Sequence, residues 1–82
     1  MFKNKTSTGK NNLCGENVYF FRKKQTAPKM SQRKLAEELQ LRGIDVDKNA
    51  IQRIESGQRF VTDIELKVLA EIFKISVDEL LS

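Results

Sequence analysis

Four polar side chains lie close together between residues 48 and 56, and their types are those that bind the edges of DNA bases. They are Lys48, Asn49, Gln52 and Arg53. Arg and Lys donate to guanine O6 and N7, whereas Asn and Gln pair with adenine N6 and N7. Only Ala50, Ile51 and Ile54 are apolar here, so a helix over this segment would expose most of its surface. Composition alone leaves two interpretations open, a helix that reads bases and an ordinary solvated helix.

The remaining residues offer little to an enzyme or to a metal site. The chain contains no histidine, and Cys14 is its single cysteine, so His-based catalysis and Cys/His zinc sites are excluded. The neighbouring carboxylates Glu37-Glu38 and Asp78-Glu79 would not face each other on a helix. The four glycines form no phosphate-binding loop. We therefore expect no catalytic residue, no metal and no cofactor, and no small-molecule ligand is evident.

Positive charge is concentrated toward the start of the chain. Residues 1–30 have a net charge of +6, residues 31–61 of +1 and residues 62–82 of −3, which gives the total of +4. A basic front and an acidic back favour a polyanion as partner on one side, although an ordinary basic surface is the alternative. No apolar stretch approaches the ~20 residues of a membrane span, and no hydrophobic run follows the basic start. We therefore expect a cytoplasmic protein without membrane contact.

Periodicity divides the chain into an arm and one helical domain. Residues 1–12 are polar, basic and aperiodic, which predicts a disordered basic N-terminal arm before a domain over 13–82. Val18 and Phe21, with Phe20 as a further candidate, predict a first helix that starts at Gly15 and ends before Pro28.

Capping residues predict the four helices that follow. Ser31 and Asp47 are N-cap candidates for the second helix and for a third helix over 48–56. Gly43 and Gly57 are suited to end these two helices in the left-handed conformation. Capping boxes start a fourth and a fifth helix, and their residue pairs are Thr62 with Glu65 and Ser76 with Glu79.

Apolar residues predict which helix faces are buried. The second helix has an apolar face of Leu35, Ala36 and Leu39, with Leu41 fitting more loosely. The fourth helix is apolar on several sides, Ile64 included, so it should be the central and most buried element. The predicted fold class is an all-α bundle of five short helices.

Three segments in order carry a resemblance to a known family. They are S-Q-x-x-L-A at 31–36, I-x-x-I-E-x-G-x-R at 51–59 and L-A-x-x-x-x-I-S-V-x-E-L-L at 69–81. Together they resemble the Cro/repressor-type helix-turn-helix family, also called the Xre family, which is common in bacteria, phages and mobile elements. The resemblance covers residues 15–82. It implies a five-helix bundle of the phage-repressor DNA-binding type, with the helix-turn-helix formed by helices 2 and 3.

The resemblance implies a role for each matching position. The helix at 48–56 becomes the recognition helix in the major groove, where candidates for contact with bases or groove are Lys48, Asn49, Gln52 and Arg53. Three further residues are implied as DNA phosphate contacts: Gln32, Gln58 and Arg59. Arg22 and Glu55 match positions that pair as ions between helices 1 and 3 in relatives, which implies a structural role.

Two insertions depart from the family pattern. About five extra residues lie between Leu39 and Ile51, and about three lie between Arg22 and Ser31. The fold should tolerate both, because loop insertions cost little entropy. They leave open which side chain reaches which base, and they place Asp47 near the expected DNA surface with an unfavourable charge.

These features predict a transcriptional regulator, a repressor, that binds double-stranded operator DNA. Two-fold operators usually require a dimer. The candidate homodimer contact is the helix 4–5 region, whose apolar residues also suit an intramolecular core: Phe73, Ile75, Val77, Leu80 and Leu81. The alternative is a helical adaptor or antitoxin-like module that uses the same fold to bind a protein partner.

Overall fold

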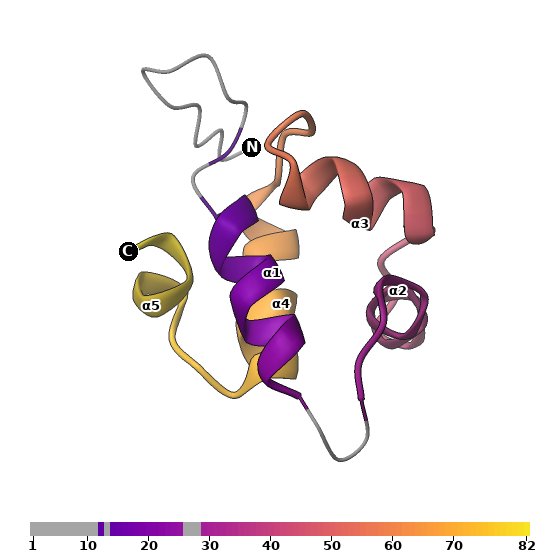
Figure 1. Ribbon diagram of the computed structural model, residues 1–82, viewed down its shortest axis with the longest axis horizontal. Coiled ribbons are helices and arrows are strands. Elements are labelled where there is room, and N and C mark those ends of the chain that lie inside the picture. Colours follow the sequence, from indigo (N-terminus) through magenta and orange to yellow (C-terminus); the bar gives the residue numbers. More distant parts are fainter. Residues whose placement is uncertain (1–11, 13, 26–28) are drawn as a thin grey trace.

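The computed structural model describes residues 12, 14–25 and 29–82. This part of the chain contains five helices (Figure 1). They are α1 (Gly15–Lys24), α2 (Gln32–Leu41), α3 (Lys48–Glu55), α4 (Asp63–Phe73) and α5 (Val77–Leu81). This confirms the predicted all-α class. None of the helices within these residues has the length and apolar character that a membrane span requires. Residues 1–11 of the predicted arm lie outside the described residues.

The predicted capping residues start the helices from α2 onward. Four side chains each accept a hydrogen bond from the backbone N–H three residues later, and they belong to Ser31, Asp47, Thr62 and Ser76. At Thr62 the backbone N–H donates in return to the Glu65 carboxylate, so this capping box is complete. The box predicted at Ser76 is only half formed, because the hydrogen bonds of the described residues include none from the Ser76 N–H to the Glu79 carboxylate.

Left-handed residues end three of the helices. Gly43 follows α2 with φ 85° and Gly57 follows α3 with φ 83°, as the sequence predicts. Lys74 ends α4 with φ 59°, which the sequence did not predict because a lysine is not a typical residue for that conformation.

Two helices share the centre of the bundle. Figure 1 shows α1 and α4 side by side, with α2 and α3 on one flank and α5 on the other. The fourth helix packs against α1, α2 and α5, as expected of a central element, but α1 is equally central because it packs against α3, α4 and α5. The core draws on every helix and includes Val18, Leu35, Leu39, Ile51, Ile54, Leu69 and Leu80.

Three apolar residues that the sequence counted toward buried faces are exposed. Leu41 is 78% exposed, Ile64 63% and Phe20 55%. Each lies two positions from a buried residue of its own helix, which is about 200° around the helix axis, so its side chain points away from the core. The predictions for these three residues were wrong for this shared reason.

The turn between α2 and α3 is packed although it is longer than the family pattern. The Leu39 carbonyl accepts a 2.9 Å hydrogen bond from the Ile44 N–H. The Gln40 Nε2 donates to the Val46 carbonyl at 2.6 Å, and the Val46 side chain is buried in the core. These contacts fix the path of the inserted residues, and with it the start of α3.

The α4–α5 region buries two of the five residues considered for a dimer contact. Phe73 is 6% exposed and Leu80 is not exposed at all, so both belong to the core of the single chain. The other three, Ile75, Val77 and Leu81, are half-buried and pack at the edge of this core.

Candidate nucleic-acid interface

The outer face of α3 gathers the four predicted base-contacting side chains. All four, Lys48, Asn49, Gln52 and Arg53, are exposed. Their spacing places them within an arc of about 140°, opposite the buried side of the helix. That buried side is formed by Ile51 and Ile54, which are 0% and 1% exposed. With respect to the described residues, none of the four side chains has a hydrogen-bond or ion-pair partner. The structure thus places these four side chains on one outward face of α3, where their donors and acceptors are unbonded within the described part of the chain.

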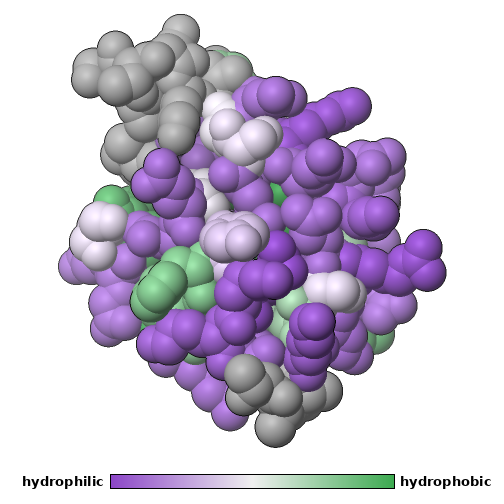
Figure 2. All heavy atoms as spheres, in the orientation of Figure 1, coloured by the Kyte–Doolittle hydropathy of each residue, from purple (hydrophilic) through white to green (hydrophobic). Residues whose placement is uncertain are grey.

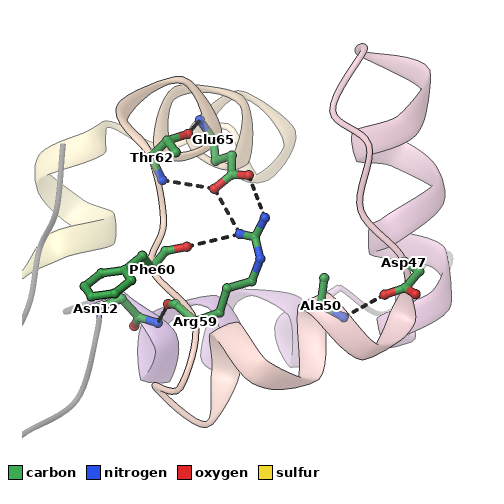
Figure 3. Close-up of polar contacts among 7 residues, drawn as sticks. All are labelled: Asn12, Asp47, Ala50, Arg59, Phe60, Thr62 and Glu65. Carbon is green, nitrogen blue, oxygen red and sulfur yellow. Dashed lines mark hydrogen bonds and ion pairs between the residues drawn. The ribbon is translucent and has the colours of Figure 1, made fainter. Parts of the chain in front are cut away.

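The first turn of α3 is fixed by Asp47. Its Oδ1 accepts a hydrogen bond from the Ala50 N–H at 2.8 Å (Figure 3). The carboxylate also lies at the positive end of the helix dipole, which partly compensates its charge. The sequence placed Asp47 near the DNA surface with an unfavourable charge, and the structure shows that this charge serves as the N-cap.

An ion pair fixes α3 against α1. The Arg22 Nε and Nη2 bind the two carboxylate oxygens of Glu55 at 2.6 and 3.1 Å. The side chains are only 9% and 6% exposed. The Arg22 Nη1 donates to the Met30 carbonyl at 3.1 Å, which extends the network to the segment before α2. A bidentate, buried pair of this kind holds three segments in one arrangement.

The Glu55 carboxylate also orients Gln32 at the start of α2. The Gln32 Nε2 donates to Glu55 Oε1 at 3.0 Å. Because an amide nitrogen carries two hydrogens, one N–H of this group is left for another acceptor. Gln32 is therefore held between the buried ion pair and the surface, in a position suited to a phosphate oxygen.

A basic hollow opens between α1, α2 and α3. It has a volume of about 510 Å³ and is lined by Arg22, Lys23, Lys29, Ser31, Gln32, Arg33 and Lys48. Figure 2 shows that hydrophilic side chains dominate the face over α2 and α3. The N-terminus of α2 borders the hollow, and its free backbone N–H groups and dipole favour an anion there. The basic hollow is thus an electrostatically attractive place for a phosphate group.

Three cations of the basic hollow were missed as site residues by sequence reasoning. They are Lys23, Lys29 and Arg33. The only available indication was the density of Lys and Arg around Ser31. Spacing along the chain could not show that the end of α1 and the starts of α2 and α3 meet at one place.

Arg59 is bound within the protein. Its Nη1 and Nη2 each bind a carboxylate oxygen of Glu65 at 3.0 Å, and Nη1 also donates to the Phe60 carbonyl (Figure 3). Glu65 is the capping-box residue of α4, so Arg59 ties the turn after α3 to the start of α4. This partner was not predicted. Gln58 beside it is exposed, and its backbone N–H bonds the Arg53 carbonyl at 2.8 Å.

The Glu65 network should make stability depend on acid pH. Partial burial alone would raise the pKa of Glu65, but the hydrogen bonds from Arg59 and Thr62 outweigh it and hold the pKa below the ordinary 4.5. A lowered pKa adds stability that is fully present above pH 4.5 and is lost as the pH falls through the folded-state value. Urea unfolding between pH 6 and 3 should therefore show a smaller acid loss in Glu65→Gln than in the unmodified protein. Equal acid losses would contradict this role.

One of the comparisons with known proteins, that with protein families, supports this geometry. No curated protein and no solved structure matches the chain. The profile of a helix-turn-helix family matches residues 22–80, which include α2, the turn and α3. Because the match covers most of the chain and the motifs are those of the Cro/repressor type, the protein belongs to the helix-turn-helix family of DNA-binding regulators.

Proposed function

We propose that the protein is a repressor that binds operator DNA with α3 in the major groove. The observation that carries this proposal is the arc of four exposed, unbonded side chains on α3 beside the basic hollow. Base edges are recognised by such Lys, Asn, Gln and Arg side chains, whereas a basic surface attracts the phosphates irrespective of sequence. The cytoplasm is the proposed location, because the partner is DNA.

The proposed phosphate contacts form two groups beside α3. The free N–H of Gln32 and the cations of the basic hollow would bind one stretch of backbone. In the turn after α3, Gln58 and Arg59 would bind a second stretch. The Glu65 and Phe60 bonds use three of the five N–H groups of the Arg59 guanidinium, so two remain for a phosphate oxygen.

A dimer on two-fold operator DNA would use the surface between α4 and α5. An apolar hollow of about 260 Å³ opens there, lined by Asp63, Leu66, Lys67, Val77 and Leu81. A second copy of the chain is the proposed occupant, since the half-site geometry of helix-turn-helix proteins places two copies on one face of the duplex. Asp63 and Lys67, which also line this hollow, would let the aspartate of each copy meet the lysine of the other across a two-fold axis.

The salt dependence of binding tests the backbone part of the proposal. Arg33→Gln removes one cation of the basic hollow, so we expect weaker binding to every duplex alike. The negative slope of log affinity against log salt should become shallower by about 0.9, the contribution of one phosphate contact. The matched control is Lys74→Gln at the end of α4, which should leave the slope unchanged.

Two outcomes would contradict the proposal. One is an equal change of slope in the two variants, which would show that the slope follows net charge and that the basic hollow has no special place in the interface. The other is duplex binding without any salt dependence, together with tight binding to a protein partner, which would favour the adaptor function.

A further inference from the structure

Asn12 is a buried polar residue with three hydrogen bonds. Only 2% of the surface of Asn12 is exposed. The Nδ2 donates to the Ile54 carbonyl at 3.1 Å and to the Arg59 carbonyl at 2.8 Å, and Oδ1 accepts from the Gly15 N–H at 2.7 Å (Figure 3 shows the bond to Arg59). Both amide hydrogens and the amide oxygen are thereby engaged. Asn12, which the sequence placed at the end of the arm, is therefore part of the packed domain.

These bonds join the start of α1 to the end of α3. The Ile54 carbonyl lies in the last turn of α3 and also accepts a hydrogen bond from the Gly57 N–H at 3.0 Å. The Arg59 carbonyl lies in the turn that follows. A single amide group thus binds the recognition helix and the turn after it to the residues before α1.

Gly15 allows this close approach. A Cβ atom at Gly15 would overlap the Ile54 carbonyl oxygen and would come within 3.2 Å of the Glu55 carbonyl oxygen. The obstacle is backbone, which cannot move aside as the end of a flexible side chain can. Any other residue at position 15 would push the end of α3 away from α1.

We propose that Asn12 and Gly15 form a joint that sets the orientation of α3 and thereby determines DNA sequence specificity without contact with DNA. This inference rests on the proposed function. The start of α3 is fixed by its turn and by Asp47, and the Glu55 ion pair holds its last turn from one side. The joint holds the backbone of that last turn at the Ile54 carbonyl. Both residues of the joint lie before the matched range 22–80.

A small rotation of α3 should harm base reading more than backbone binding. Hydrogen bonds to base edges require donor–acceptor distances within a few tenths of an ångström and a nearly linear angle. The attraction between Lys or Arg and the phosphates falls off slowly with distance, and these side chains can adjust. Loss of the joint is therefore expected to lower specific affinity while leaving non-specific affinity in place.

The test first selects an operator sequence from random duplex DNA. It then compares affinity for this operator with affinity for a scrambled duplex of the same composition. Asn12→Ala removes all three side-chain bonds without adding charge. Asn12→Asp keeps the acceptor for Gly15 but turns an oxygen toward two carbonyls. The control is Ile72→Ala in α4, a partly buried residue that packs against the core and lines neither the basic hollow nor the hollow between α4 and α5. Affinities are measured at a temperature at which circular dichroism shows that all variants are folded.

Both Asn12 variants should lose roughly tenfold in the specific-to-nonspecific ratio, about the effect of one mismatched base pair. Ile72→Ala should retain the ratio even though it loses stability. In the free protein, amide hydrogen exchange at Gln58 and Arg59, whose N–H groups bond the Arg53 carbonyl, should accelerate in Asn12→Ala relative to amides of α4.

The outcomes separate this inference from the proposed function. A wild-type protein that discriminates between the duplexes, with Asn12 variants that keep its ratio, would overturn the joint and leave the repressor function intact. A wild-type protein with no preference for any duplex would overturn both the repressor function and the role of the joint in specificity. Accelerated exchange in Asn12→Ala would then show only that the joint stabilises the fold.

Discussion

Replacing Glu55 by alanine is expected to destabilise the fold by about 3–5 kcal/mol, the typical effect of stranding a buried charge. The Arg22 guanidinium would lose both carboxylate bonds while it stays buried, and Gln32 would lose its partner as well. Small domains have total stabilities of only about 5–15 kcal/mol, so a large drop in melting temperature should follow. Urea unfolding monitored by circular dichroism measures this effect directly.

Two control variants sharpen the Glu55 experiment. Glu38→Ala breaks ion pairs with Lys34 and Arg42 that lie on the surface of α2, and it should change stability little. Changing Arg22 and Glu55 together to methionine should recover part of the loss, because apolar side chains of similar size can replace a buried pair. If the melting temperature did not change in Glu55→Ala, the Arg22–Glu55 pair would not stabilise the fold.

Arg53→Ala is expected to weaken binding to the operator by about 1–3 kcal/mol and to relax selectivity at one base-pair position. Arg53 is exposed on the outer face of α3 and its side chain has no partner among the described residues. Its removal should therefore leave the melting temperature close to that of the unmodified protein. Fluorescence anisotropy on a panel of single-base operator variants measures both effects.

Arg33→Gln is the matched comparison for Arg53→Ala. Both variants lose one positive charge, but Arg33 lines the basic hollow whereas Arg53 lies on the outer face of α3. The Arg33 variant should bind all members of the panel more weakly by the same factor. If Arg53→Ala also lost the same factor on every sequence, Arg53 would be a backbone contact and not a reader of bases.

Local features of the fold could be predicted from sequence because they depend on a few neighbouring residues. Ser31, Asp47 and Thr62 each start a helix, since their side chains accept from a backbone N–H only three residues away. Gly43 and Gly57 end helices because glycine adopts positive φ without steric cost. The same local logic placed the four polar residues of α3 on one face.

Features that depend on contacts between distant segments could not be predicted in this way. The bond between Asn12 and the Arg59 carbonyl spans 47 positions. The Arg59–Glu65 pair depends on the direction of the turn after α3, which spacing does not reveal. The basic hollow likewise requires the packing of three helices. The Arg22–Glu55 pair, found at 2.6 Å, could be anticipated only through the family resemblance.

The selection of bound sites from random duplex DNA at near-physiological salt tests the central claim most directly, because it asks whether the outer face of α3 reads sequence. We expect enrichment of one motif, repeated with two-fold symmetry if the protein binds as a dimer. A variant with alanine at Asn49, Gln52 and Arg53 should lose the motif while it still binds duplex DNA. Recovery of random sequences by the unmodified protein, or of the same motif by the variant, would contradict the account.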